Sequence, residues 1–293
     1  MFKLFAVPPD LQPWLEAVVI LRGSDALRES RFPAMLTSML VLRLEGCVHC
    51  HGHSVPRAAW IAPHERPTVF AHEGGVHAVG LVLRPEFAAC LLGGAARGLR
   101  NSILSMDEVL GRTGETAEGT MVRQAWAVLQ GELRAHREDE SQVTALLRFT
   151  RAVLGSAPDA EARRQQALSL WQAASRGLEA SDLARPSGLG RRQFERRFVA
   201  LWGFTPKQVR LLDRFNSTLH RALSGSPQDG AQLALEQGFF DQAHMGRDMR
   251  RLAGGALRTL HPRHESSGGD SHWPLQVGIR SRVQPSMRQP RKR

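Results

Sequence analysis

The first third of the chain alternates short apolar runs with turns rich in Gly, Pro and His. The apolar runs lie at residues 39–44, 58–62 and 78–84. Short apolar runs bounded by turn residues are typical of strands. Several of them at close spacing predict a small barrel or a sandwich. We therefore expect residues 1–110 to be rich in β-strands.

A helical pattern follows the strands. Pro85 predicts the start of a short helix over 86–92, because proline suits the first turn of a helix. Apolar residues then recur every three or four positions over 120–135 and over 141–154, which predicts two longer helices. The segment 155–162, GSAPDAEA, has the composition of a linker.

Beyond this linker, residues 163–260 are predicted to be helical throughout and to form a second domain after a first domain of 1–155. Apolar residues at spacings of three and four predict one continuous helix from Pro206 to Leu223. These residues are Val209, Leu212, Phe215, Leu219 and Leu223. Such a helix is roughly 25 Å long, and it joins two segments that resemble each other.

Each of the two segments has the pattern of a helix-turn-helix unit, the first at 181–203 and the second at 231–254. A small residue lets two helices cross closely, and a glycine permits the positive φ found at the end of a helix. Both segments place an alanine four residues before a glycine, as Ala184 before Gly188 and as Ala234 before Gly238.

A second helix is predicted after each turn. It follows a capping position, Gly190 in the first unit and Asp241 in the second. Apolar residues at four and eight positions after the cap lie on one face of a helix. They are Phe194 and Phe198 in the first unit and Met245 and Met249 in the second. Each unit also has one arginine, Arg196 or Arg247, six positions after the cap.

Charge separates the two halves of the chain. Residues 1–160 have 16 Lys and Arg against 17 Asp and Glu, a net charge of −1, whereas residues 161–293 have 23 against 11, a net charge of +12, so all the excess positive charge lies in the second half. A basic field attracts a polyanion by releasing its counterions. Together with two helix-turn-helix patterns it indicates nucleic-acid binding. Residues 261–293 have no periodicity and much Gly, Ser, Pro and Arg, which predicts a disordered basic tail.

Several other classes of protein are disfavoured. Cys47, Cys50 and Cys90 are too few for a disulfide framework in a chain of 293 residues. The N-terminus has no long apolar core before its prolines, so no secretory signal is predicted. No apolar run approaches the ~18 residues of a membrane helix. We expect a cytoplasmic protein without a membrane partner. No Ser/His/Asp pattern or phosphate loop indicates an enzyme, and no cofactor is expected.

Residues 163–260 resemble the DNA-binding domain of the AraC/XylS-type transcription regulators. In the first unit the resemblance rests on Gly188, Leu189, Arg192, Phe194, Arg196 and Phe198, followed by Gly203, Pro206, Lys207 and Arg214. In the second unit it rests on Ala234, on Gly238 to His244, and on Arg247, Asp248, Met249 and Gly254. The segments RFPA at 31–34 and LRP at 83–85 resemble the sensor domain of the same family.

The resemblance implies an α+β fold. A small, cupin-like barrel with helices would act as sensor and dimerisation domain, and an all-α domain of two helix-turn-helix units would bind double-stranded DNA. The expected function is a sequence-specific transcription regulator, with activator as the working assignment. Its two recognition helices would enter successive major-groove segments. A small-molecule effector, RNA polymerase and a second copy of the chain are the other expected partners.

Departures from the family pattern concern the first unit. The family favours Ser where Gly190 stands, so the side-chain cap is missing there. Pro186 lies inside the first predicted helix of this unit, where proline removes a backbone hydrogen bond and clashes with the preceding turn. We therefore expect this helix to end or bend near Ala184, and the first unit to be the looser of the two.

Outward-facing polar residues of the recognition helices are the candidate DNA contacts. Arg pairs with guanine and Gln with adenine through two hydrogen bonds, and the N-terminal end of such a helix usually meets the bases. We expect base contacts from Arg192, Gln193, Arg196, Gln242 and Arg247. We expect phosphate contacts from Arg197, Arg250 and Arg251. Arg191 faces outward as well, and His244 is either a phosphate contact or a capping residue.

The sequence CVHCHGH at 47–53 is the main candidate for a metal site. In one strand, Cys47, His49, His51 and His53 would all point to one face. Four such residues span about 20 Å, so a single ion needs a further ligand such as His64, His72 or His77. Ordinary packing cysteines in a His-rich turn are the simpler interpretation.

This motif supports one alternative function, a metal sensor or a metal-dependent small-barrel enzyme fused to a DNA-binding domain. Such an enzyme would use His49 and His51 as a ligand pair, with Glu65 or Glu73 as the carboxylate. A second alternative is a non-specific, chromatin-like or recombination-associated DNA binder without an effector.

Overall fold

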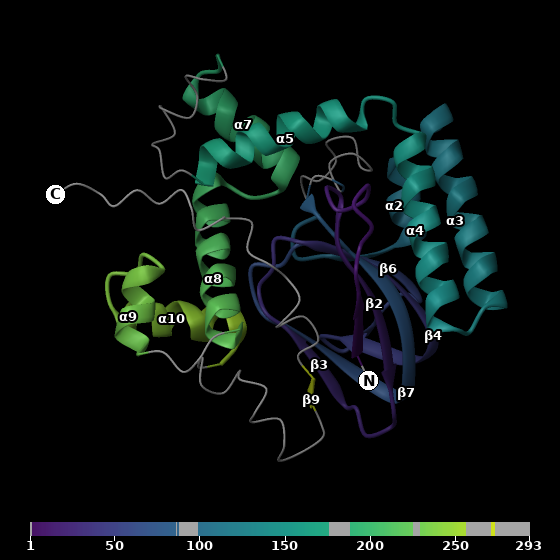
Figure 1. Ribbon diagram of the computed structural model, residues 1–293, viewed down its shortest axis with the longest axis horizontal. Coiled ribbons are helices and arrows are strands. Elements are labelled where there is room, and N and C mark those ends of the chain that lie inside the picture. Colours follow the sequence, from purple (N-terminus) through teal and green to yellow (C-terminus); the bar gives the residue numbers. More distant parts are fainter. Residues whose placement is uncertain are drawn as a thin grey trace.

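The computed structural model shows a mixed α+β chain, with an N-terminal antiparallel sheet domain and a C-terminal domain of helices, as the sequence predicts. Figure 1 shows the sheet domain between two groups of helices. The structure describes residues 2–85, 87, 99–175, 188–224, 229–255 and 271–272. None of the helices in these ranges is both long and apolar enough to cross a membrane.

The main sheet has the strand order β1-β2-β7-β4-β6-β8, and its neighbours are antiparallel. The strands are β1 (Phe2–Phe5), β2 (Leu15–Gly23), β3 (Glu29–Phe32), β4 (Ser38–Cys50), β5 (His53–Ser54), β6 (Ala58–Ile61), β7 (Thr68–Leu83) and β8 (Ile103–Ser105). The three predicted apolar runs lie in β4, β6 and β7. The long strand β7 pairs with β4 on one edge and with β2 and then β3 on the other.

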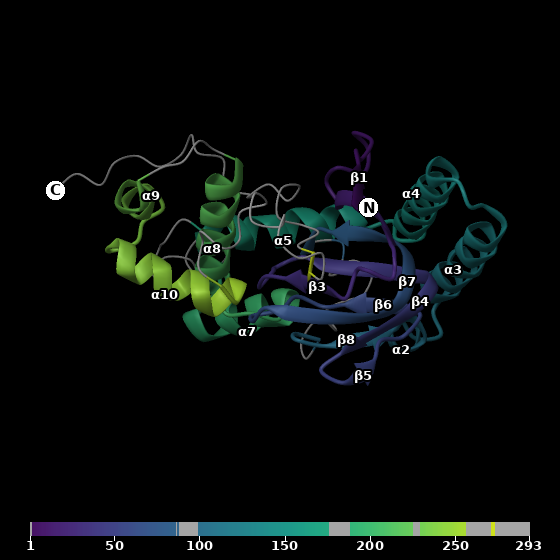
Figure 2. The ribbon, with the colours of Figure 1, turned by 90° about the horizontal axis from the view of Figure 1, so that it is seen from below.

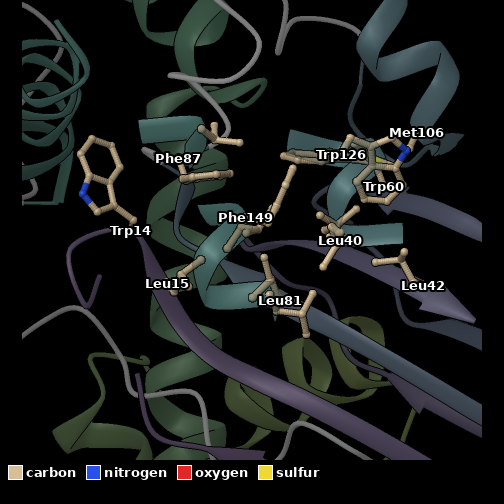
Figure 3. Packing of buried hydrophobic residues seen from close by; sticks show 14 of the residues in the cluster. Trp14, Leu15, Leu40, Leu42, Trp60, Leu81, Phe87, Met106, Trp126 and Phe149 are labelled. Carbon is tan, nitrogen blue, oxygen red and sulfur yellow. The ribbon is translucent and has the colours of Figure 1, made fainter. Parts of the chain in front are cut away.

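Alternation along the strands produces two apolar layers. In β4, Leu40 and Leu42 belong to a core that the helices cover, whereas Met39 belongs to a second core on the opposite face of the sheet. Figure 3 shows the first core, where Leu40 and Leu81 of the sheet lie near Trp126 and Phe149 of the covering helices.

The helices are α2 (Met106–Arg112), α3 (Ala117–Ala135), α4 (Asp139–Gly155), α5 (Ala160–Ser175), α7 (Arg191–Trp202), α8 (Pro206–Ser224), α9 (Gly230–Glu236) and α10 (Gln242–Ala253). The helices predicted over 120–135 and 141–154 are confirmed as α3 and α4. The linker is shorter than predicted, because α5 begins at Ala160. The helix predicted over 86–92 falls almost wholly outside the described residues.

The tail from 261 to 293 also lies outside the described residues, except for the short strand β9 (Ser271–His272), which pairs in parallel with β3. This pairing contradicts the prediction of disorder at these two residues. Backbone N–H and C=O groups of an edge strand can pair with another segment whatever its side chains are, so composition did not reveal it.

Helix α5 links the two domains. Its first residue, Ala160, is buried in the core under the sheet, whereas Ala167, Leu170 and Trp171 are buried in the core of the C-terminal helices. Near the start of the helix, the Arg164 guanidinium carbon lies 5.7 Å from the ring centroid of Trp14 in the sheet domain. The helix therefore packs against both domains rather than acting as a free tether.

The two domains also meet at the segment between β3 and β4. Ala34 and Leu36 are buried in the core of the C-terminal domain. The Ala34 N–H donates a hydrogen bond of 2.7 Å to the carbonyl oxygen of Leu252, in the last turn of α10. We call this contact region the domain seam, and it fixes the position of the helices relative to the sheet.

Candidate nucleic-acid interface and effector cavity

The second helix-turn-helix unit consists of α9, a turn at Gly238 and α10. Gly238 has φ of 73°, in the left-handed region that glycine favours. The Asp241 carboxylate caps α10 by accepting a hydrogen bond of 2.6 Å from the His244 N–H. Gly254 ends α10 with φ of 79°. These elements agree with the sequence prediction for this unit.

In the first unit the structure describes the turn and the recognition helix α7. Gly188 has φ of 65°, Gly190 is the N-cap and Gly203 ends the helix with φ of 69°. In place of a side-chain cap, the Gly190 N–H donates a 3.4 Å hydrogen bond to the Gln193 side-chain oxygen. The first helix of this unit, with Ala184 and Pro186, lies outside the described residues.

Both recognition helices bury the predicted face. Phe194, Phe198 and Met249 have no exposed surface, and Met245 is 4% exposed. Leu252 is buried as expected, whereas Leu201 is only partly buried at the edge of the core. The apolar period therefore fixes which side of α7 and α10 faces outward.

The opposite faces are exposed and basic. The exposed candidates are Arg191, Arg192, Gln193, Arg196 and Arg197 on α7, and Gln242, Arg247, Arg250 and Arg251 on α10. No ion pair or hydrogen bond of the described chain occupies the side chains of Arg192, Arg196, Arg197, Arg247 and Arg250. These five guanidinium groups remain available for an external acceptor.

Other candidates have partners within the chain. Arg191 donates to Glu195 one turn along α7, at 3.3 Å. Arg251 donates to the buried carboxylate of Asp248, at 3.1 Å. The structure thus brings Arg251 to the recognition face, but as part of an ion pair.

His244 is held inside its own unit. Its Nδ1 accepts a 3.5 Å hydrogen bond from the Phe240 N–H, its Nε2 lies 3.7 Å from an Asp248 oxygen, and its ring packs edge-on against Phe239 with centroids 5.4 Å apart. Of the two predicted roles, the capping and packing role matches this geometry.

A partly buried ion pair joins α8 to the second unit, and the sequence analysis did not predict it. Arg214 of α8 donates to Asp248 at 3.2 Å and to the Gly238 carbonyl oxygen at 3.4 Å. Its guanidinium carbon lies 4.4 Å from the ring centroid of Phe239, a cation–π distance. Arg214 therefore fixes the turn and the recognition helix to α8. The available signal was an acidic residue on the apolar face of α10.

Helix α8 separates the two recognition helices. Figure 1 shows α7 near one end of α8 and α10 near the other, and Figure 2, seen from below, shows α9 beside α8 on the side away from the strands. The 19 residues of α8 correspond to roughly 28 Å of helix. Neighbouring major-groove segments on one side of DNA repeat at about 34 Å, so the separation is compatible with both helices meeting one duplex.

The sheet domain contains a cavity of about 80 Å³. Side chains from β1, β2, β3, β4, β6 and β7 line it, among them Phe2, Val19, Phe32, Met39, Ala59 and Phe70. A cavity needs a volume of roughly 10–15 Å³ to hold one water. The cavity is therefore large enough for a small molecule and mostly apolar.

Three polar side chains lie in the cavity wall, those of Arg43, His72 and Ser30. Arg43 shares its strand face with Met39 and Val41 and donates a 3.1 Å hydrogen bond to the Val55 carbonyl oxygen. Burial lowers the pKa of its guanidinium. The other two form a buried pair, with His72 Nε2 and the Ser30 hydroxyl 2.7 Å apart. A ligand that accepts hydrogen bonds would be oriented by Arg43.

The structure corrects the predicted arrangement of the CVHCHGH motif. Strand β4 ends at Cys50, and His51 and Gly52 form a two-residue turn with φ of 51° and 78°, the pattern of a type I′ hairpin. His53 pairs with Cys50, so it lies on the face opposite to Cys47 and His49. The turn reverses the chain, which the single-strand prediction ignored.

The described residues around the motif do not form a metal site either. Cys50 is buried in the second core, and burial raises the pKa of its thiol. His49 Nδ1 lies 3.6 Å from a carboxylate oxygen of Glu73. Within the described ranges, no group of three or more His, Cys, Asp and Glu is arranged to hold a metal ion.

Comparisons with known proteins give structural matches only. No protein-family model matches the chain, and no curated protein matches it significantly. The chain is similar to the crystal structure of ToxT from Vibrio cholerae O395, with a TM-score of 0.42 and 11% sequence identity, over 84% of this chain and 98% of that chain.

Two further crystal structures of ToxT are similar in the same way. The unsaturated fatty acid-bound wild-type protein from Vibrio cholerae strain SCE256 has a TM-score of 0.38 and 10% identity, over 81% of this chain and 93% of that chain. ToxT from strain O395 bound to (E)-4-(8-methylnaphthalen-1-yl)but-3-enoic acid has a TM-score of 0.41 and 10% identity, over 82% and 95%.

Proposed function

We propose that this chain is a sequence-specific, double-stranded DNA-binding transcription regulator of the AraC/XylS type. The observation that carries the proposal is the exposed, unpaired arginine face on each of two capped helices, α7 and α10, whose apolar faces are buried in one core. Bases and phosphates are the acceptors that such faces suit. The net charge of the C-terminal half supplies the attraction.

The described contacts refine the proposed division of roles. We assign base contacts to Arg192 and Arg196 on α7 and to Arg247 on α10, and phosphate contacts to Arg197 and Arg250. Gln193, Gln242, Arg191, Arg251 and His244 have a smaller proposed share. Gln193 caps α7, and the amide of Gln242 lies against Gly230. Arg191, Arg251 and His244 have charged partners within the chain.

Selection of binding sites from random duplex DNA by the full chain tests the function. Two working recognition helices predict a motif of two short blocks about one helical turn apart. The variant Arg28→Ala serves as a control. It removes one positive charge from an exposed position of the sheet domain, and it should leave the motif unchanged. Binding without any motif, lost in modest salt, would instead indicate a non-specific basic binder.

The cavity of the sheet domain is the proposed effector site. Its apolar lining suits an apolar small molecule, and Arg43 suits an acceptor group on that molecule. Phe32 and Met39 line the cavity, whereas Ala34 and Leu36 between them are buried in the C-terminal core. We propose that a ligand acts on DNA binding through this eight-residue segment, 32–39.

Helix α3 is the proposed dimerisation face. Met121 and Val128 are 49% and 56% exposed on it, and Figure 1 shows the α3 and α4 pair on the side of the sheet domain away from α8 and α10. Exposed apolar residues on one helix face suit pairing with a second copy. Activation through RNA polymerase and a cytoplasmic location are parts of the same proposal.

A further inference from the structure

Phe240 has the most exposed large apolar side chain in the part of the chain that the structure describes. Its exposed fraction is 86%, against 68% for Leu235 and 56% or less for the others. A single exposed apolar residue is ordinary on a protein surface, but Phe240 stands directly before the N-cap of the recognition helix α10. This position indicates a role in recognition.

Packing of the second unit does not depend on Phe240. In the first unit a single residue, Leu189, lies between the turn glycine and the N-cap, and it packs partly buried against the core. The turn of the second unit is one residue longer, and Phe239 and Phe240 fill it. Phe239 takes the packing role, since it is 4% exposed and belongs to the same core. Phe240 is the additional residue, and its ring stays outside the core.

The backbone of Phe240 is fixed at the start of α10. Its N–H donates a 3.5 Å hydrogen bond to Nδ1 of His244, in the first turn of the helix. The Asp241 carboxylate holds the same turn by accepting from the His244 N–H at 2.6 Å. The structure therefore presents the exposed ring at a defined place in front of the recognition helix.

The outer face of α10 next to the ring carries little side-chain bulk. Ala243 is exposed, and Gly246 lies three positions further on, a spacing that shares one helix face. A Cβ added at Gly246 would meet only the Arg250 guanidinium, at 3.8 and 3.9 Å. Arg247 follows on the same face, four positions after Ala243. The two small residues allow base edges to come close between the ring of Phe240 and the guanidinium of Arg247.

We propose that Phe240 reads a thymine in the major groove by packing its ring against the methyl group of the base. This inference rests on the proposed function, because it requires α10 to bind DNA. The N-terminal end of a recognition helix meets base edges, and the methyl group of thymine is the apolar feature that a phenylalanine can contact there. A phenyl ring has no hydrogen-bonding group, so the methyl group alone distinguishes thymine for it.

The test uses the full chain and the duplex obtained by binding-site selection. In the block whose sequence preference Arg247→Ala relaxes, each thymine is replaced in turn by uracil, which lacks only the methyl group. For the wild type, one replacement should weaken binding about three- to fourfold, as expected for the loss of one buried methyl group. Phe240→Ala should bind the thymine duplex at least threefold more weakly than the wild type does, and the same replacement should have almost no further effect on it.

Leu235→Ala is the matched control, because it removes another exposed apolar side chain from the second unit. It should keep the full ratio of thymine to uracil affinity. Phe240→Ala should keep the Tm of the wild type, since the ring lies outside the core. It should also keep the salt dependence of binding, since no charge is removed. These two measurements separate a contact with the methyl group from damage to the unit and from a lost phosphate contact.

Three results would overturn the inference and leave the proposed function intact. The first is a selected motif in which the block read by Arg247 has no preferred thymine. The second is a uracil effect that is equal in the wild type and in Phe240→Ala, or absent from both. The third is full affinity of Phe240→Ala for the selected duplex, as expected if the ring docks on another protein. Failure to select any motif would remove the proposed function, and this inference with it.

Discussion

The two helix-turn-helix units reach the same shape by different means. In the second unit, polar contacts determine the geometry: Asp241 caps α10, and Asp248 binds Arg214 of α8 and Arg251. The first unit has Gly190 at the capping position and no side-chain cap. The same backbone geometry at the turn therefore does not require the same interactions.

Aromatic packing takes the place of these polar contacts in the first unit. Phe194 and Phe198 have ring centroids 5.8 Å apart, Phe198 and Trp202 are 6.1 Å apart, and Trp202 packs on Trp171 of α5 at 4.8 Å. Packing against α5 and the seam makes the first unit depend on its neighbours. The second unit depends more on contacts within itself and with α8.

The largest expected effect on the free energy of unfolding comes from the aromatic core. Phe198→Ala should lower the free energy of unfolding by about 3–5 kcal/mol, because Phe198 has no exposed surface and its removal leaves a cavity. Urea unfolding of the full chain measures it. Met249→Ala is the counterpart in the second unit and should cost about 2–5 kcal/mol. A cost below about 1 kcal/mol for Phe198→Ala would contradict the role given to aromatic packing.

The next largest effect on stability concerns the partly buried ion pair of the second unit. Asp248→Ala should cost about 2–3 kcal/mol, since it leaves Arg214 without its carboxylate in a part-buried position. Glu195→Ala is the control in the first unit, where the exposed pair with Arg191 should contribute less than about 1 kcal/mol. If the two variants cost the same by urea unfolding, the polar network does not distinguish the units.

A smaller effect is expected at the cap of α10. Asp241→Ala should destabilise the chain by about 1 kcal/mol, because the His244 N–H loses its acceptor. Asp241→Gly, which copies the first unit, should cost only a few tenths of a kcal/mol. Thermal unfolding of both variants provides the comparison, and equal losses would argue against a capping role for the side chain.

The smallest expected effect is a gain in stability when Gly190 is replaced. This residue has φ of −67° and ψ of 153°, which any residue can adopt, and no atom within 4 Å obstructs a new Cβ except the Gln193 side-chain oxygen at 4.0 Å. Gly190→Ser should therefore raise the stability by a few tenths of a kcal/mol. A loss of stability would show that the Gly190–Gln193 contact is the better cap.

Local patterns predicted most of the helical domain. The glycines at 188 and 238, the caps at 190 and 241 and the apolar period of α8 each depend on neighbours within a few residues, so the sequence reveals them directly. The same holds for the arginine faces, since the positions of Phe194 and Met245 determine which side of each helix is exposed.

Long-range contacts were beyond such patterns. The pairing of Arg214 with Asp248 spans 34 positions, and the docking of Ala34 against Leu252 depends on how two domains meet. The CVHCHGH prediction failed because His51 and Gly52 form a tight turn, and period two applies only within a strand. Strand β2 is an apolar run that the sequence analysis passed over.

The most direct test of the account compares Arg196→Ala and Arg247→Ala on the selected DNA site. Each block of the motif is randomised in turn, and the affinity of the full chain is measured at fixed salt. The account predicts that Arg196→Ala relaxes preference in one block and Arg247→Ala in the other, each costing about 1–3 kcal/mol. If both variants affect the same block, or neither changes any preference, two separate recognition helices do not read this site.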